Sequence, residues 1–250
     1  MPRISSRVEM KASFTKGRQM GFYMPLKIAV IDSGINRSHS HVGNVVGGHG
    51  YRINGDGQVE LHPDFEDGIG HGTAIAGILN QKAPLADLYG IKIFQKELTA
   101  PASVLIAALK WTIEAKINII HLSLGTENED YREDLNALCR KAHDSGIVIL
   151  AAARSPHDPI IPAALQTVIG VFWDRQCSKD IISHHPGKKI EFGAYGWPRE
   201  IPGMPQEMNF RGNSFAVAHV TGKIAQIAEK YPRAQPAFLK KKLCQLSVER

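Results

Sequence analysis

The sequence predicts a single α/β domain with a mainly parallel central sheet and helices on both faces. Five short apolar runs, each typical of a strand buried in a parallel sheet, alternate with helical patterns along the chain. The 250 residues are 43% hydrophobic and 22% charged, so the chain is long and apolar enough to bury a large core. The five runs cover residues 27–32, 88–94, 117–124, 146–152 and 167–172.

The first run, residues 27–32, predicts a buried strand that ends in a turn. It reads Lys-Ile-Ala-Val-Ile-Asp and is followed directly by Ser33 and Gly34. Residues 36–70 are then rich in glycine and have little apolar periodicity, so we expect a long loop or a hairpin there. Loops of this length within a compact domain are commonly functional.

Helical patterns account for much of the remaining chain. Helices are predicted at residues 73–79, 102–115, 131–144, 214–230 and from about residue 235 onward. Residues 176–211 are irregular and rich in proline and glycine, while residues 1–25 are polar and basic without periodicity. We therefore expect a flexible basic N-terminal arm over residues 1–25 and one folded domain over residues 26–250.

Charge and cysteine content exclude several classes of protein. The 30 Lys and Arg residues and 24 Asp and Glu residues give a net charge of +6, but the excess is spread out, so we expect no nucleic-acid partner. No apolar run is long enough to span a membrane, and the N-terminus lacks the apolar segment of an export signal. An odd number of cysteines without C-x-x-C spacing argues against a disulfide framework and a cysteine zinc site. These features predict a cytoplasmic protein without a membrane partner.

Three motifs place polar side chains where strands meet loops or helices, the edge at which open α/β folds bind ligands. Asp32 ends the first strand, His71 lies between two glycines before a helix, and Ser214 begins the helix over residues 214–230. Taken singly, Asp32 is explained as a turn residue and Ser214 as a helix cap. Taken together, they supply a nucleophile, a base and a carboxylate that orients the base, in a chain order known for serine hydrolases.

These motifs resemble those of the subtilisin-like serine peptidases, the subtilase family. The shared motifs are Val-Ile-Asp-Ser-Gly at residues 30–34, Gly-His-Gly-Thr at residues 70–73 and Gly-Asn-Ser-Phe-Ala at residues 212–216. The resemblance implies a subtilisin-like three-layer fold and a serine endopeptidase that cleaves polypeptides through an acyl-enzyme. Ser214 is then the nucleophile, His71 the general base and acid, and Asp32 the carboxylate that fixes the imidazole tautomer.

The resemblance also implies which residues bind a polypeptide substrate. Leu-Ser-Leu-Gly at residues 122–125 is similar to the substrate-lining strand of the family, and residues 148–153 to the strand that leads to the oxyanion hole. Ile160 stands where the family commonly has the glycine that floors the pocket for the side chain before the cut, which predicts a shallow pocket. The implied substrate-binding residues are Ser123, Leu124, Gly125, Ala153, Arg154 and Ile160.

The sequence departs from the family at the oxyanion hole. The family usually has Gly-Asn after its Ala-Ala-Ala strand, and this asparagine donates to the oxyanion, but Arg154 and Ser155 stand here. We expect Ser155 and the backbone N–H of Ser214 to be the two donors. Arg154 either favours an acidic or small polar substrate side chain or points to solvent. The alternative function is a subtilase-fold pseudo-peptidase that binds peptides with weak or no catalysis.

The resemblance implies no required cofactor. Many subtilases hold calcium, but no acidic ladder identifies a calcium site in this sequence. The histidines within residues 39–62 lack the helical spacing of a metal hydrolase, so we expect surface histidines and no metal ligands. We also expect neither an inhibitory pro-domain before residue 27 nor the final strand that many members have. The sequence predicts neither the natural substrate nor the oligomeric state.

Overall fold

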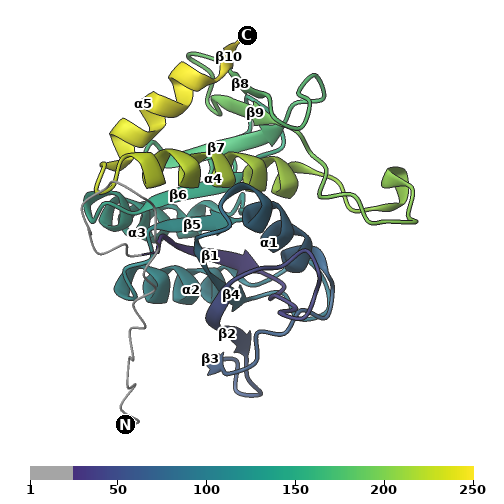
Figure 1. Ribbon diagram of the computed structural model, residues 1–250. Helices are drawn as coiled ribbons and strands as arrows, with labels where there is room; N and C mark the ends of the chain where they lie inside the picture. The colour runs from purple at the N-terminus through teal and green to yellow at the C-terminus, as the bar shows by residue number, and fades with distance from the viewer. Residues whose placement is uncertain (1–24) are drawn as a thin grey trace, which may run out of the picture.

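The computed structural model describes residues 25–250 and shows a sheet of ten strands between two layers of helices (Figure 1). The strand order across the sheet is β10-β8-β9-β7-β6-β5-β1-β4-β2-β3. The strands are β1 (Lys27–Asp32), β2 (Val45–Ile53), β3 (Val59–His62), β4 (Asp87–Lys92), β5 (Ile119–Leu122), β6 (Val148–Ala152), β7 (Val168–Trp173), β8 (Ile182–His184), β9 (Phe192–Ala194) and β10 (Val248–Glu249). Residues 1–24 of the expected N-terminal arm lie outside the described residues.

Helices connect the strands and follow the last of the central ones. The α-helices are α1 (His71–Lys82), α2 (Ala102–Glu114), α3 (Arg132–Asp144), α4 (Asn213–Lys230) and α5 (Pro236–Leu246). Two short 3-10 helices are η1 (Glu129–Tyr131) and η2 (Gln206–Met208). In Figure 1, the green segment that precedes α4 projects beyond the ends of the central strands.

The five predicted apolar runs form the parallel centre of the sheet. Strands β4, β1, β5, β6 and β7 lie side by side and run parallel, which confirms the predicted fold class. In β1, Ile28 and Val30 face one core while Ala29 and Ile31 face the other, because successive side chains of a strand point to opposite faces. The carboxyl ends of these strands meet at one edge, where Asp32 lies.

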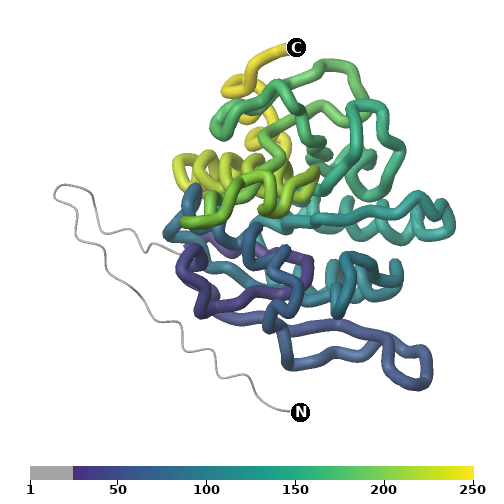
Figure 2. Tube along the Cα trace, turned by 90° about the vertical axis from the view of Figure 1, so that its right-hand side faces the viewer, coloured from purple at the N-terminus to yellow at the C-terminus, as the bar shows by residue number. Residues whose placement is uncertain are grey.

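Two apolar cores lie on opposite faces of the sheet. The first contains the buried faces of α1, α4 and α5, with Phe215 and Phe192 among its largest side chains. The second contains those of α2 and α3, with Leu105 and Leu109. Figure 2 shows the same arrangement from the side, with α4 on one side of the sheet and α2 and α3 on the other. Helices α1 and α4 pack against each other, and their N-terminal residues meet where the ring of Phe215 packs on that of His71.

The glycine-rich segment forms the hairpin that was one of its two expected conformations. Strand β2 runs parallel beside β4 and pairs antiparallel with β3 at the edge of the sheet. Only glycine fits at position 48, because a Cβ there would lie 2.2 Å from the carbonyl oxygen of Gly90.

The prediction of an irregular segment over residues 176–211 is wrong in part. It contains β8 and β9, which pair antiparallel, and β9 extends the parallel sheet beside β7. The expectation of no strand after the last helix is also wrong, because β10 pairs parallel with β8. Strands of two or three residues are too short to produce the alternating pattern by which strands are recognised.

Candidate active site

Asp32 is the last residue of β1 and its side chain is fully buried. Its Oδ1 accepts the backbone N–H of Ser33 at 2.7 Å. Burial by itself raises the pKa of Asp32. The charge of His71 and hydrogen bonds from His71, Ser123 and Ser33 outweigh the burial and lower this pKa. The site therefore holds a buried, ionised carboxylate.

His71 is the first residue of α1 and contacts Asp32 directly. Its Nδ1 lies 2.8 Å from Oδ1 and 3.0 Å from Oδ2 of Asp32. The close packing requires glycine at position 72, where a Cβ would lie 2.2 Å from the carbonyl oxygen of Gly34 and 3.2 Å from Oδ1 of Asp32. Burial lowers the pKa of His71, but the charge of Asp32 and its hydrogen bond raise it overall. Because a carboxylate only accepts hydrogen bonds, Nδ1 carries the proton of the neutral ring and Nε2 is left as the base.

Ser214 is the second residue of α4, and the described residues show no hydrogen bond between it and His71. Its Oγ instead donates to the carbonyl oxygen of Ser123 over 3.4 Å, a long hydrogen bond. The ring of Phe215, the next residue of α4, packs against His71 with 5.1 Å between ring centroids. Catalytic hydrogen bonds are often long without substrate and tighten when it binds. Asp32 and His71 are thus in direct contact, and Ser214 is held close to them through Ser123.

Asp67 is a site residue that the sequence reasoning missed. Its carboxylate accepts the backbone N–H groups of Ile69 and Gly70 at 2.9 and 2.8 Å. It also accepts the backbone N–H and the hydroxyl of Thr73 at 2.9 and 2.6 Å, so it caps the start of α1. Its charge is one of the causes that raise the pKa of His71. An aspartate shortly before a helix start is a capping signal that was available in the sequence.

The segment expected to supply the second oxyanion donor is held by local hydrogen bonds. Ala153 follows β6 directly and is buried. The Oγ of Ser155 accepts the backbone N–H of His157 at 3.3 Å, and its carbonyl oxygen accepts that of Asp158 at 3.2 Å. Within residues 25–250 no hydrogen bond uses the hydroxyl proton of Ser155. That proton is free to donate, and the role of Ser155 stays a prediction.

Two carboxylates bind Arg154. Its Nε and Nη2 donate to Asp158 at 2.9 and 2.7 Å, and Nη2 also pairs with Glu127. The side chain of Asp158 is 1% exposed, whereas that of Arg154 is 59% exposed. The expected preference for an acidic substrate side chain assumed a free cation at this position. Because the charge of Arg154 is already compensated, the structure gives that preference no support.

Leu124 and Gly125 follow β5 and lie beside the segment that contains Ile160. Thr126 and Ile161 exchange two backbone hydrogen bonds of 2.7 and 3.0 Å, which align the two segments. A Cβ placed at Gly125 would lie 2.7 Å from Cγ1 of Ile160, so the isoleucine side chain packs directly on this glycine. This contact agrees with a pocket whose floor is partly filled.

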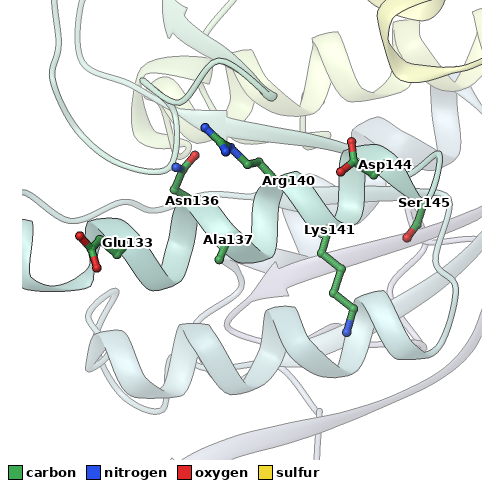
Figure 3. A pocket seen from close by; sticks show the side chains of 7 residues that line it. All are labelled: Glu133, Asn136, Ala137, Arg140, Lys141, Asp144 and Ser145. Carbon is green, nitrogen blue, oxygen red and sulfur yellow. The ribbon is translucent and has the colours of Figure 1, made fainter.

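Two surface hollows differ in their relation to this site. The larger, about 590 Å³, is lined by side chains that come from α3 and from Ser145 directly after it, as Figure 3 shows. Since α3 covers the opposite face of the sheet from α1 and α4, this hollow is separate from the site. The smaller, about 340 Å³, lies beside the start of α1, and its lining includes Gly70 and Phe210. The ring of Phe210 is 5.7 Å from that of His71, so this hollow adjoins the site.

The histidines of the glycine-rich segment do not converge on a metal site. The rings of His39 and His41 pack edge to face with 5.0 Å between centroids, while His49 packs on Trp111. Within residues 25–250, no group of three or more His, Cys, Asp or Glu side chains is placed to hold a metal ion. The same part of the chain has no helix long and apolar enough to cross a membrane. Its cysteines, Cys139, Cys177 and Cys244, are free thiols.

Comparison with known proteins agrees with this geometry. The chain matches the model of the subtilase family over residues 25–171, which include Asp32 and His71 and end before Ser214. Subtilisin E of Bacillus subtilis (strain 168) is 31% identical over 224 residues, which cover 83% of this chain and 56% of that protein. An intracellular serine protease of Paenibacillus polymyxa is 29% identical over 255 residues, which cover 92% of this chain and 73% of that protein. The chain therefore spans little more than half the length of subtilisin E.

Solved structures share the fold. Sphericase superposes with a TM-score of 0.67 at 22% identity, covering 88% of this chain and 82% of that chain. A lanthipeptide protease superposes with a TM-score of 0.68 at 20% identity, covering 86% of this chain and 78% of that chain. At such identities the likeness shows the fold alone. The family model, in contrast, matches more than half of the residues, and this chain belongs to the subtilase family.

Proposed function

We propose that the protein is a serine endopeptidase that hydrolyses peptide bonds of polypeptides through an acyl-enzyme. The observation that carries this proposal is the buried hydrogen bond between Nδ1 of His71 and Oδ1 of Asp32, 2.8 Å long, beside the serine at the start of α4. The carboxylate fixes the imidazole so that Nε2 is available as a base. Family membership supports the same function.

The proposed reaction has two halves. The Oγ of Ser214 attacks the carbonyl carbon of the scissile bond while Nε2 of His71 takes the hydroxyl proton. The C–N bond then breaks, His71 gives this proton to the leaving amine, and the acyl group stays on Ser214. A water molecule attacks the acyl group with His71 again as base, which releases the carboxylic acid and the free serine. Asp32 stays ionised throughout and stabilises the imidazolium.

The negative oxygen of each tetrahedral intermediate needs hydrogen-bond donors. The first backbone N–H groups of a helix have no partner within it, so the N–H of Ser214 is available. The hydroxyl of Ser155 is the proposed second donor, and it is shorter in reach than an asparagine amide. We therefore expect catalysis to be slower than a full pair of donors would allow.

The proposed substrate is an extended polypeptide. Its backbone pairs as an added strand with Leu124 and Gly125, so alternate side chains reach the pockets of the protein. The side chain before the cut meets Ile160, whose bulk favours small residues over large aromatic ones. Because Asp158 and Glu127 neutralise Arg154, this position adds no preference for acidic residues.

A pseudo-peptidase that binds peptides without efficient cleavage is the second candidate. Ser155 in place of the amide donor favours it, as does the long hydrogen bond that Ser214 makes to Ser123. The complete set of Asp32, His71 and Ser214 favours the peptidase, because binding alone requires no buried, hydrogen-bonded carboxylate and imidazole beside a serine.

A fluorophosphonate probe distinguishes the two candidates. Labelling requires both an activated hydroxyl and a formed oxyanion hole, so we expect the probe to attach to Ser214, with the site located by mass spectrometry of peptides. Ser214→Ala and His71→Ala are the matched controls and should not be labelled. A folded wild-type protein that takes up no probe and leaves an unfolded protein substrate intact would establish the pseudo-peptidase instead.

We also propose that the protein acts in the cytoplasm, without a required cofactor and without a membrane or nucleic-acid partner. The free thiols support a reducing compartment, and one relative is named an intracellular serine protease. Purified protein that keeps its activity in a chelator of divalent cations would support the absence of a required metal ion.

A further inference from the structure

A histidine on β5 is buried next to the active site, and the reaction above gives it no role. His121 is fully buried, and it lies on the same face of the strand as Ile119 and Ser123, the face covered by α4. Its neighbours on the adjacent strands are Val30 and Leu150. An imidazole among aliphatic side chains is costly unless both of its nitrogens are hydrogen-bonded.

Both nitrogens of His121 have partners that belong to the active site or to its supporting helix. Nδ1 lies 3.1 Å from Oγ1 of Thr221 in α4, and Nε2 lies 3.0 Å from Oγ of Ser123. The hydroxyl of Ser123 is one of the groups that lower the pKa of Asp32, and the carbonyl oxygen of Ser123 accepts the hydroxyl of Ser214. A continuous chain of side chains thus runs from Thr221 through His121 and Ser123 to Asp32.

The imidazole of His121 is neutral, which gives this chain a direction. Burial lowers the pKa of His121 to about 4. Two titratable groups face His121: the charge of Asp32 raises this pKa, and the charge of His71 lowers it. A neutral imidazole donates from one nitrogen and accepts at the other. The protons of the chain therefore all point toward Asp32 or all point away from it.

The charge of Asp32 decides between these directions. If Nδ1 donates to Thr221, Nε2 is the acceptor and the hydroxyl of Ser123 must donate to it. The single proton of this hydroxyl is then not available to Asp32. If Nε2 donates to Ser123, the hydroxyl of Ser123 is free to donate to Asp32, and hydrogen bonds to a charged acceptor are about twice as strong as neutral ones. The hydroxyl of Thr221 then turns from the carbonyl oxygen of Val217, 2.8 Å away, which as a helix carbonyl already accepts a backbone N–H.

We propose that His121 is a positioning residue of the active site, held as the Nε2–H tautomer, which directs the hydroxyl of Ser123 onto Asp32. It touches no substrate and acts by fixing the orientation of the carboxylate that holds His71. Through Ser123 it also steadies the carbonyl group that binds the hydroxyl of Ser214. The inference deepens the proposed peptidase function and its kinetic test rests on that function.

The first test observes the tautomer and needs no activity. Ring-15N-labelled histidine in the full chain gives separate NMR signals for protonated and unprotonated ring nitrogens, and the His121 signals are assigned by their loss in His121→Gln. We expect a proton on Nε2 at neutral pH. A proton on Nδ1 would overturn the proposed direction whether or not the protein is a peptidase.

The second test separates positioning from simple packing. His121→Leu keeps similar volume but removes both hydrogen bonds, so kcat should fall about 10- to 100-fold with KM little changed. His121→Gln places an amide near the position of Nε2 and should recover most of the activity. Equal losses in the two variants would show that only ring packing matters and would overturn the proposal.

The third test is a double-mutant cycle with Ser123→Ala. Because His121 acts through Ser123, His121→Leu should cost little further activity in a Ser123→Ala background. If the fold-losses of the two single variants instead multiply in the double variant, the two residues act independently, which would contradict this coupling. Wild-type protein that cleaves nothing would refute the peptidase function. In that case, or if His121→Leu does not fold, the tautomer measurement still decides the hydrogen-bond direction.

Discussion

The two sides of the active site are built in different ways. Asp32 and His71 are 0% and 5% exposed, and each makes short hydrogen bonds fixed by the surrounding backbone. On the other side, Arg154 is largely exposed, and Ser155 makes its contacts within its own turn. The first side is determined by close packing, whereas the second is a surface loop whose side chains bind one another.

This difference separates the ability to react from its rate and selectivity. A substitution of Asp32 or His71 leaves a buried charge without its partner, and a larger residue next to them clashes with the backbone. Such changes should therefore abolish or strongly reduce the reaction. A change in the loop alters how many donors meet the oxyanion and which side chains fit, so it should only adjust the reaction. The predictions below compare the two sides in order of expected effect.

Loss of the nucleophile or the base should have the largest effect. Ser214→Ala and His71→Ala should each lower kcat by roughly 10⁴-fold or more, and the double variant should lose little beyond that, because the groups act as a unit. Hydrolysis of a chromogenic peptide measures all three variants. Multiplied losses would mean that the two residues act independently, and near-normal rates in Ser214→Ala would refute the mechanism.

The contact between Asp32 and His71 should determine the pH dependence of activity. His71 works as a base only when it is unprotonated, and its pKa is raised above 6.5, so kcat/KM should fall as the pH decreases through a midpoint above 6.5. Asp32→Asn removes the cause of this shift. It should move the midpoint to lower pH and reduce kcat by about 10³- to 10⁴-fold. A midpoint that does not move would show that Asp32 does not control the ionisation of His71.

The packing behind the pair should come next in sensitivity, with a smaller effect. In Gly72→Ala the added Cβ meets the carbonyl oxygen of Gly34 at 2.2 Å, which forces α1 away from Asp32. We expect activity to fall about 10- to 100-fold and the free energy of unfolding to fall by about 1–3 kcal/mol. Gly68→Ala is the matched control, because nothing lies within 4 Å of a Cβ there. Equal effects of both substitutions, measured by kinetics and denaturant unfolding, would contradict the close-packing argument.

The sequence singled out the residues of the buried side, and the structure brings Asp32 and His71 together, because the signals of these residues are local. A strand that ends in Asp32 and a histidine between glycines are each contained within a few residues, and the helix of small residues after Ser214 is equally compact. Long apolar runs likewise predicted the five central strands. The short strands β8, β9 and β10 could not be predicted, because two or three residues show no recognisable alternation. In addition, β9 and β10 pair with the earlier strands β7 and β8.

Side-chain pairing between distant segments also escaped the sequence reasoning. Arg154 was expected either to favour an acidic or small polar substrate side chain or to point to solvent, and its pairing with Asp158, only four residues further on, was overlooked. The approach of Glu127, across the bridge between Thr126 and Ile161, has no local signal. The role of His121 was missed for the same reason, since Thr221 is 100 residues away along the chain. Long-range polar contacts of this kind require the fold to be known first.

The oxyanion loop should respond to substitution with a gain. If Ser155 occupies the position of the second donor, Ser155→Asn provides a longer donor and should raise kcat on an activated ester about tenfold. Ser155→Ala is the control and should lower it, because it removes the hydroxyl. An unchanged rate in both variants, with the fold intact by circular dichroism, would place the donor elsewhere.

The smallest expected effect concerns selectivity at Ile160. Its side chain packs on Gly125, so Ile160→Gly should open space for a larger substrate side chain before the cut. We expect kcat/KM for a Phe peptide to rise about fivefold relative to an otherwise identical Ala peptide, a gain of about 1 kcal/mol. Ile160→Val keeps the branched side chain and should leave the ratio nearly unchanged. Wild-type protein that already prefers Phe to Ala would show that Ile160 does not fill the pocket, and the loop would then select substrates by another contact.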